Sequence, residues 1–329
     1  MLDHLDAWLA ERGQPDYRAR QIRGWLGRGV LDFEAMDDLP RELRLQLAAS
    51  FRPSSLREIA VSEADDGSTT KVLYELEGGF TVEAVVMRYP RRVTLCISSQ
   101  VGCPIGCPFC ATGQGPFGRN LSAREIVDQA LDAKRRLRGE GRDLSHVVFM
   151  GMGEPLANYD AVVRAVRDLP LSPRRVTVST SGLVPRIEQL AGEGLPVTLA
   201  ISLHAARDEL RDELVPINRK YPLAAVIGAA DAFGRRTGRR VSYEWVLLAG
   251  VNDTERDAVE LGRLLRGKLA HVNLIPFNPV DSTPYHAPSA PDVRRFARQV
   301  REQGLNVTVR DTRGREADAA CGQLRARYS

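Results

Sequence analysis

The sequence of 329 residues has few cysteines, almost no lysine and no long apolar run. No uninterrupted apolar stretch approaches the roughly 18 residues that a membrane span requires. The N-terminus, MLDHLDAWLAERG, lacks the positive start and the apolar stretch of a secretory signal. These absences predict a cytoplasmic protein with no membrane segment. Hydrophobic residues make up 43% of the chain and charged residues 27%, which excludes an intrinsically disordered protein.

Lysine is scarce, because only four of the 46 basic residues are lysine and the other 42 are arginine. The net charge is +4. Arginine binds phosphates bidentately and stacks on bases, so this composition suits a nucleic-acid partner. A genome that favours arginine codons explains the excess equally well. The arginines gather in four clusters, at residues 88–92, 135–142, 235–240 and 310–327.

Cysteine is also scarce, and its number is odd. An odd cysteine count in a long cytoplasmic chain argues against a disulfide framework and favours metal binding or thiol chemistry. The five cysteines are Cys96, Cys103, Cys107, Cys110 and Cys321.

The first 88 residues divide into two small units. Apolar residues recur at helical spacing within residues 1–52, which predicts a helical accessory domain that either contacts RNA or caps the rest of the chain. Residues 53–88 change to period-two patterning, with turn signals at 65–68 and 78–79, and predict a short antiparallel β meander. Glu83 falls inside the last apolar strand, where a solvent-facing position is the ordinary explanation.

From residue 89 to 315, short strand-like runs alternate with amphipathic helical stretches. Six such units predict an α/β fold with a parallel sheet and helices outside it. Six units are fewer than the eight of a closed barrel, so we expect a partial, open (β/α)6 barrel, with LNVTVRD at its last edge. The predicted helices begin near Ser122, Tyr159, Val184, Leu223, Thr254 and Pro291.

The most specific pattern is CPIGCPFC, which spaces Cys103, Cys107 and Cys110 as C-x3-C-x2-C after a strand. Three thiolates in one tight loop indicate a soft-metal site. A structural zinc site needs four ligands, and Cys96 could supply the fourth. Three thiolates on a four-iron cluster instead leave one iron open for a substrate or cofactor.

These cysteines lie in a longer run of motifs that resembles one known family. CISSQVGCPIGCPFCATG is followed in order by GMGEPLAN, STSG, ISLHA, LIPFNP and DAACGQL. The cysteine loop resembles that of the radical S-adenosylmethionine superfamily. The whole set, over nearly the entire chain, is similar to the RNA adenine-C2 methyltransferases within it. A sister branch that methylates adenine C8 shares most of these strings.

The resemblance implies two cofactors, a 4Fe-4S cluster on Cys103, Cys107 and Cys110, and S-adenosyl-L-methionine beside it. Polar groups just past the ends of barrel strands face the active site of such folds. Taken singly, the serines and the asparagine are also ordinary strand-end caps, and a lone histidine is more often a core residue. The residues that the resemblance assigns to the S-adenosylmethionine site are Gly153, Glu154, Ser179, Ser202, Leu203, His204 and Asn278.

The resemblance also implies three catalytic residues outside the cysteine triad. Cys321, in a C-terminal segment of residues 316–329, matches the methyl carrier, although a small buried cysteine is the ordinary explanation there. Cys96 matches the thiol that releases the product through a transient disulfide with Cys321. Glu83 matches the general base that removes the C2 proton.

The function that the resemblance implies is radical methylation of adenosine C2 in 23S rRNA, and also in tRNA at the adenosine 3′ of the anticodon. It implies these RNAs and an electron donor as partners, and a monomeric enzyme. C8 methylation by the sister branch is the alternative within enzymes. A non-catalytic RNA-binding protein with a structural metal knuckle is the alternative from another class.

Overall fold

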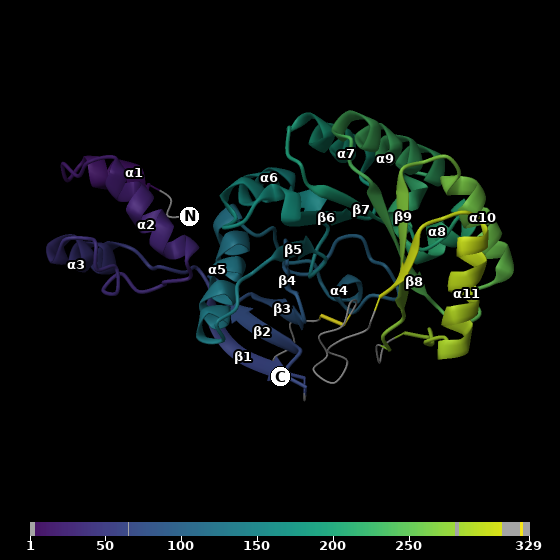
Figure 1. Cartoon of the computed structure of the whole chain (residues 1–329), viewed down its shortest axis with the longest axis horizontal. Coiled ribbons are helices and arrows are strands. Elements are labelled where there is room, and N and C mark those ends of the chain that lie inside the picture. The colour runs from purple at the N-terminus through teal and green to yellow at the C-terminus, as the bar shows by residue number, and fades with distance from the viewer. Residues whose placement is uncertain (1–3, 65, 280–282, 311–322, 325–329) are drawn as a thin grey trace.

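The computed structural model describes residues 4–64, 66–279, 283–310 and 323–324 (Figure 1). The N-terminal helical unit stands to one side of the sheet, next to α5 (Figure 1). Its leucines face inward at helical spacing, and Leu5, Leu26 and Leu47 are fully buried. This pattern confirms the predicted helices. They are α1 (Leu5–Ala10), α2 (Tyr17–Gly27) and α3 (Arg41–Ser50).

The predicted meander forms β1 (Arg57–Glu63), β2 (Thr69–Glu75) and β3 (Thr81–Tyr89). β2 pairs antiparallel with both β1 and β3, and β3 in turn pairs antiparallel with β4 (Arg92–Cys96). The meander is therefore an extension of the main sheet. Directly opposed residues share a face of a sheet. Because Val85 is opposite Cys96, these two side chains lie on the same face, which we call the inner face.

The parallel part of the sheet begins at β4, and the described residues carry ten strands in the order β1 to β10. Strands β4 to β10 pair in parallel, each with the next along the chain. Since β1 and β10 lie at opposite ends of this order, the sheet is open, as predicted. The further strands are β5 (His146–Phe149), β6 (Val176–Thr180), β7 (Thr198–Ser202), β8 (Val241–Leu247), β9 (Ala270–Pro276) and β10 (Val307–Val309).

The crossover helices cover the outer face, whereas the short α4 lies on the concave side (Figure 1). The six predicted helix starts agree with the structure to within one residue, and three of them carry a side-chain cap. Ser122 and Glu125 form a capping box on α5, and Thr254 with Asp257 forms another on α10. The helices are α4 (Ala111–Gln114), α5 (Ala123–Gly139), α6 (Tyr159–Asp168), α7 (Val184–Gly192), α8 (Asp208–Leu214), α9 (Leu223–Thr237), α10 (Glu255–Leu265) and α11 (Ala290–Glu302).

The main core lies between the sheet and the outer helices, where fully buried Trp245 stacks on Phe296. A smaller apolar cluster lies on the concave side and includes Phe109, Leu214 and Phe277. It packs against the loop of the cysteine motif and so supports that loop from the inside of the sheet. Among the described residues, no helix is both long and apolar enough to cross a membrane.

Candidate active site

The three cysteines of the C-x3-C-x2-C motif line one cavity on the concave side of the sheet, with a volume of about 140 Å³. Burial raises the pKa of Cys103 to about 12 and raises the pKa of Cys107 well above its usual value. Thiols bind metals as thiolates, so metal binding here must release protons. In the described part of the chain, no three His, Cys, Asp or Glu side chains converge to hold a single ion. Cys96, the predicted fourth zinc ligand, is not among the residues that line the cavity.

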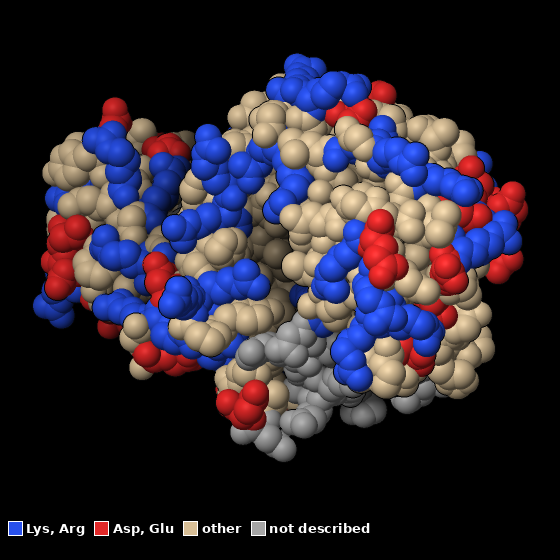
Figure 2. Space-filling model, turned by 45° about the vertical axis from the view of Figure 1, so that its right-hand side comes forward, with Lys and Arg blue, Asp and Glu red and all other residues tan. Residues whose placement is uncertain are grey.

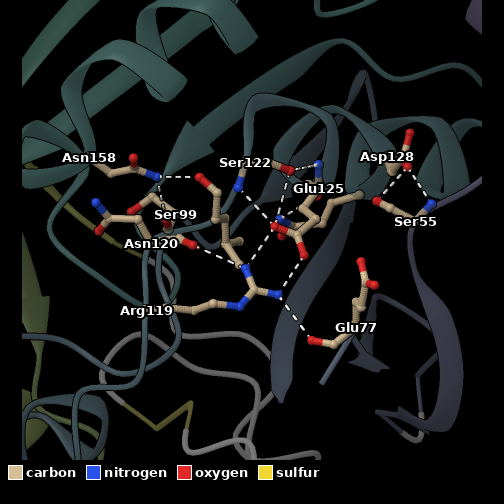
Figure 3. A network of polar contacts seen from close by, with 11 residues as sticks. Ser55, Glu77, Ser99, Arg119, Asn120, Ser122, Glu125, Asp128 and Asn158 are labelled. Atoms are coloured by element: carbon tan, nitrogen blue, oxygen red, sulfur yellow. Dashed lines mark hydrogen bonds and ion pairs between the residues drawn. The ribbon is translucent and has the colours of Figure 1, made fainter. Parts of the chain in front are cut away.

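The loop that carries these cysteines, residues 102–117 (the cluster loop), is closed at its base by a neck of residues 99–101 and 118–121. Asn158 donates hydrogen bonds to the carbonyls of Ser99 at 2.9 Å and Leu121 at 2.7 Å, one on each side of the neck (Figure 3). Backbone hydrogen bonds join Val101 to Arg119 and Gly118 to Val101. The neck fixes both ends of the cluster loop with protein groups alone.

Glu154 places a carboxylate in the cavity just past β5. It is 3% exposed, and it accepts hydrogen bonds from the Leu156 amide at 2.9 Å and from the Ser181 amide and hydroxyl at 2.7 and 2.8 Å. Burial raises its pKa despite these donors. Since these donors are neutral, a carboxylate here favours a cationic ligand group such as an ammonium.

Gly153 forms a cradle beside this carboxylate. Its φ is +102°, a conformation that favours glycine, and an added Cβ would lie only 2.7 Å from Cβ of Gln100 and 2.8 Å from the Ser99 hydroxyl. That hydroxyl is buried and has no partner among the described residues. Glycine is therefore required for the turn to pack against Ser99 and Gln100, and the backbone of Gly153 also lines the cavity. The residues present therefore fit both the 4Fe-4S cluster and S-adenosylmethionine. The soft thiols suit iron, and the Glu154 carboxylate suits an amino-acid ammonium.

His204 also lines the cavity, and its tautomer follows from its partner. Its Nδ1 accepts the backbone N–H of Val246 at 3.0 Å, so the neutral ring carries its proton on Nε2 and can donate to a ligand. Burial, and then the charge of Arg211, lowers the pKa of His204 to about 3. Nearby, the hydroxyls of Ser179 and Ser202 lie 3.4 Å apart and both line the cavity.

Sequence patterns missed Arg211, which is completely buried beside these turns. Its guanidinium donates to the carbonyls of Ser181 at 2.7 Å, Ser202 at 3.1 Å and Leu203 at 3.1 Å, and to the Asn218 side chain. It thereby ties the turn after β6 to the turn after β7. Burial lowers its pKa to about 10, so the group stays charged at neutral pH. In an arginine-rich chain, nothing local marks this arginine as special.

Asn252 is a second residue that the patterns missed. It is fully buried and donates to the carbonyls of His204 at 2.8 Å and Val246 at 2.7 Å. His204 has a φ of +60°, in the left-handed region that non-glycine residues rarely adopt. The Asn252 amide is positioned to hold that conformation. Glu244, also unpredicted, lines the cavity and accepts hydrogen bonds from Ser242 and Asn273, each at 2.7 Å.

The remaining predicted residues are not among those that line the cavity. Leu203 is fully buried and Asn278 is 2% exposed. Glu83 is also buried, at 4% exposure, and pairs with the Lys71 ammonium at 3.2 Å. The solvent-facing explanation for Glu83 is therefore wrong, because the strand turns this side chain toward the inside of the sheet.

The two lone cysteines differ in what the structure shows of them. Cys96 is buried at the end of β4. It shares the inner face with Val85 of β3, and therefore with Glu83 two residues earlier. Cys321 lies outside the described residues. Leu324, three residues later, lines the cavity, and its carbonyl accepts a hydrogen bond from the Thr112 hydroxyl at 2.6 Å.

Comparison with known proteins places this site in a family. The radical SAM superfamily profile matches residues 97–262, and a profile for the N-terminal domain of ribosomal RNA large subunit methyltransferases matches residues 2–52. A probable dual-specificity RNA methyltransferase RlmN from Frankia alni is 53% identical over 95% of this chain and 79% of its own length. One of the same name from Salinispora tropica is 52% identical, covering 97% of this chain and 89% of its own.

A solved structure is similar over the same extent. The crystal structure of a radical SAM methyltransferase from Sphaerobacter thermophilus superposes with a TM-score of 0.95 at 48% sequence identity. The match covers 98% of this chain and 97% of the other. Both the accessory helices and the open sheet are therefore shared with a protein of that class.

Proposed function

We propose that this chain, which belongs to the RlmN family of radical SAM RNA methyltransferases, methylates C2 of adenosine in 23S rRNA and in tRNA at the adenosine 3′ of the anticodon. It is an enzyme whose cofactors are a 4Fe-4S cluster and S-adenosylmethionine. The observation that carries the proposal is the shared cavity, in which the cysteine triad faces Glu154 and His204. The relatives are named for dual specificity, which supports both RNAs as substrates.

Within this cavity, Cys103, Cys107 and Cys110 hold the cluster. Bound together, the cluster and S-adenosylmethionine supply the radical chemistry that an inert adenine C–H bond requires. Glu154 and the backbone of Gly153, which both line the cavity, bind the cofactor ammonium. Ser179, Ser202 and the Nε2–H of His204 bind its oxygen-bearing groups, and Leu203 and Asn278 support them from behind the cavity wall.

Three residues act on the methyl group and the base. The Cys321 sulfur accepts a methyl group from S-adenosylmethionine and carries it to the adenine. The Cys96 thiolate then attacks the Cys321 sulfur, so that an S–S bond forms as the S–C bond to the RNA breaks; the carbon keeps the electron pair and takes a proton, and an electron donor reduces the disulfide. Glu83 takes the C2 proton. The shared inner face of Cys96 and Glu83 and the position of Leu324 beside the cluster loop support this assignment.

The chain organisation fits an enzyme on large RNA. We propose four units, with residues 1–52 as an RNA-contacting accessory domain, 53–88 as the meander, 89–315 as the radical SAM core and 316–329 as the catalytic segment. The matched N-terminal profile supports the first boundary. Lysine and arginine side chains spread across the face in Figure 2, on both sides of a central hollow. We expect a cytoplasmic monomer that meets its RNA through such surfaces.

Mass spectrometry of nucleosides tests the function directly. After anaerobic incubation with S-adenosylmethionine, a reductant and RNA, we expect 2-methyladenosine from rRNA and from tRNA. A product methylated at C8 would assign the chain to the sister chemistry, and unmodified RNA would contradict the proposal.

Two cysteine variants test the mechanism. Cys321→Ala removes the carrier, so no methyl group reaches protein or RNA. Cys96→Ala keeps the carrier, so the enzyme should stall as a covalent protein–RNA adduct, seen as a nuclease-sensitive shift on a denaturing gel. The double variant is the control and should form no adduct. Identical behaviour of the two single variants would contradict these roles.

A further inference from the structure

Two phenylalanines are exposed on neighbouring surface segments outside the cavity. Phe80, in the turn between β2 and β3, is 38% exposed, and Phe117, at the end of the cluster loop, is 46% exposed. An added Cβ at Gly118 would lie 3.4 Å from Cε1 of Phe80, so this ring lies directly against the backbone next to Phe117. Exposed aromatic rings on adjoining segments mark an interaction surface more often than isolated ones do.

A dense network of polar contacts holds the two segments that carry these rings (Figure 3). Arg119 binds Glu125 through two hydrogen bonds, at 2.9 and 2.7 Å, and donates to the Glu77 carbonyl at 3.4 Å. Its guanidinium also lies over the Phe80 ring, 5.3 Å from the centroid. Arg119 thus joins the segment that carries Phe117 to the turn that carries Phe80. A surface held this rigidly loses little conformational entropy when a ligand binds.

The surroundings of the rings are charged. A surface hollow of about 1300 Å³ adjoins them and shares Gly79 and Arg119 with their segments. Its walls carry both signs of charge, because Arg57 pairs with Glu75 and Arg119 with Glu125, and they also include the exposed Arg52. On the inner side, an added Cβ at Gly102, next to the cluster ligand Cys103, would lie 3.1 Å from Cα of Phe117. The rings therefore lie between this charged hollow and the cluster loop.

We propose that Phe80 and Phe117 form a stacking platform for an unpaired base of the RNA substrate that flanks the modified adenosine. The inference rests on the proposed function. Proteins that recognise single-stranded RNA stack its bases on aromatic side chains and follow its backbone with positive charge. Both features are present here, because the rings supply the stacking faces and the exposed Arg52 lies in the adjoining hollow. The position of Phe117 beside Gly102 and the cluster loop, where the proposed RNA substrate is modified, favours an RNA base over a protein partner.

A binding experiment with matched variants tests the platform. The probes are a hairpin RNA with the sequence of a tRNA anticodon stem-loop and a duplex made from its stem alone. Phe80→Leu/Phe117→Leu keeps an apolar side chain but removes the stacking faces, and Phe80→Tyr/Phe117→Tyr keeps the rings. In anisotropy titrations, the Leu variant should bind the hairpin about 10- to 100-fold more weakly than wild type, and the Tyr variant should match wild type.

The duplex and the salt dependence separate stacking from charge. Duplex affinity and the slope of hairpin affinity against salt should not change in the Leu variant, because phosphate contacts remain. Equal hairpin affinity of the Leu variant and wild type would overturn the platform. A change of the RNA-free protein from dimer to monomer in the Leu variant would also overturn it, since the rings would then join two copies.

The methyltransferase activity of the wild-type enzyme is measured separately, by nucleoside mass spectrometry. If wild type methylates RNA while the Leu variant binds the hairpin normally, the platform is wrong and the function stands. If wild type produces no methyladenosine, the proposed function is wrong, and the hairpin titration still decides whether the rings bind an unpaired base.

Discussion

Two carboxylates are buried in different halves of the same sheet, and the protein treats their charges differently. Glu83, in the antiparallel half, is 4% exposed and is paired with Lys71. Glu154, in the parallel half, is 3% exposed, and the described residues that bond to it do so through neutral N–H and O–H groups. Burying a charge without a counter-ion is costly. The comparison shows that Glu83 has a counter-ion within the meander, whereas Glu154 is positioned to take its counter-ion from a cationic ligand.

Removing the cysteine triad should have the largest effect, because it disables the parallel half alone. In the Cys103→Ala/Cys107→Ala/Cys110→Ala variant we expect loss of the visible iron–sulfur absorbance and of all RNA methylation, with β1–β3 intact by circular dichroism. Iron and sulfide analysis checks the cluster. Cys96→Ala is the control and should keep its iron, because Cys96 does not line the cavity. A full iron complement in the triple variant would refute the cluster assignment.

The two carboxylates themselves give the next test. Glu154→Gln removes the charge and sets an amide against the Ser181 donors, so S-adenosylmethionine should bind more weakly by about 1.5 to 3 kcal/mol, or roughly 10- to 150-fold. Glu83→Gln is the matched control and should leave cofactor affinity unchanged, because Glu83 lies outside the cavity lining. Isothermal titration calorimetry measures both. Similar losses of S-adenosylmethionine affinity in the two variants would contradict the different roles of Glu154 and Glu83.

The smallest expected effect concerns His204 and the pH dependence of stability. Its pKa is lowered in the folded protein from 6.5 to about 3, so below pH 6.5 only the unfolded chain takes up this proton. The resulting stabilisation is complete above pH 6.5 and is lost as the pH falls toward 3. Between pH 6.5 and 5 the loss is about 2 kcal/mol in the free energy of unfolding.

Denaturant titrations of wild type and His204→Asn at both pH values measure this difference. Asparagine tolerates the positive φ and can accept the Val246 amide, but it does not titrate. The variant should therefore lose about 2 kcal/mol less than wild type over this interval. Parallel curves for the two proteins would show that His204 is not held neutral by the fold.

The features that could be predicted from the sequence are those that depend on residues close together in the chain. The starts of α5 and α10 agree because the capping residues Ser122 and Thr254 act within one turn. The cysteine spacing likewise identifies the cluster loop by itself. Family resemblance was needed for Glu154 and His204, since a glycine-rich turn or a lone histidine has many uses.

Residues that act across the fold escaped prediction. Arg211 and Asn252 act on turns 8 to 48 residues away in the chain, and their partners are backbone carbonyls, which carry no sequence signal. For Glu83, alternation alone leaves the solvent-facing alternative open, because it cannot distinguish the two faces of a sheet when both are covered. Its burial depends on the neighbouring Lys71 strand, which is 12 residues away.

The neck of the cluster loop determines when the cluster can be inserted. Asn158 and the hydrogen bonds between residues 99–101 and 118–121 close the loop without any metal. The entropy of closing a loop of this length, about 3 kcal/mol, is therefore lost during folding, before iron arrives. The free energy of closing the loop is then supplied by the fold, so that metal binding need not supply it.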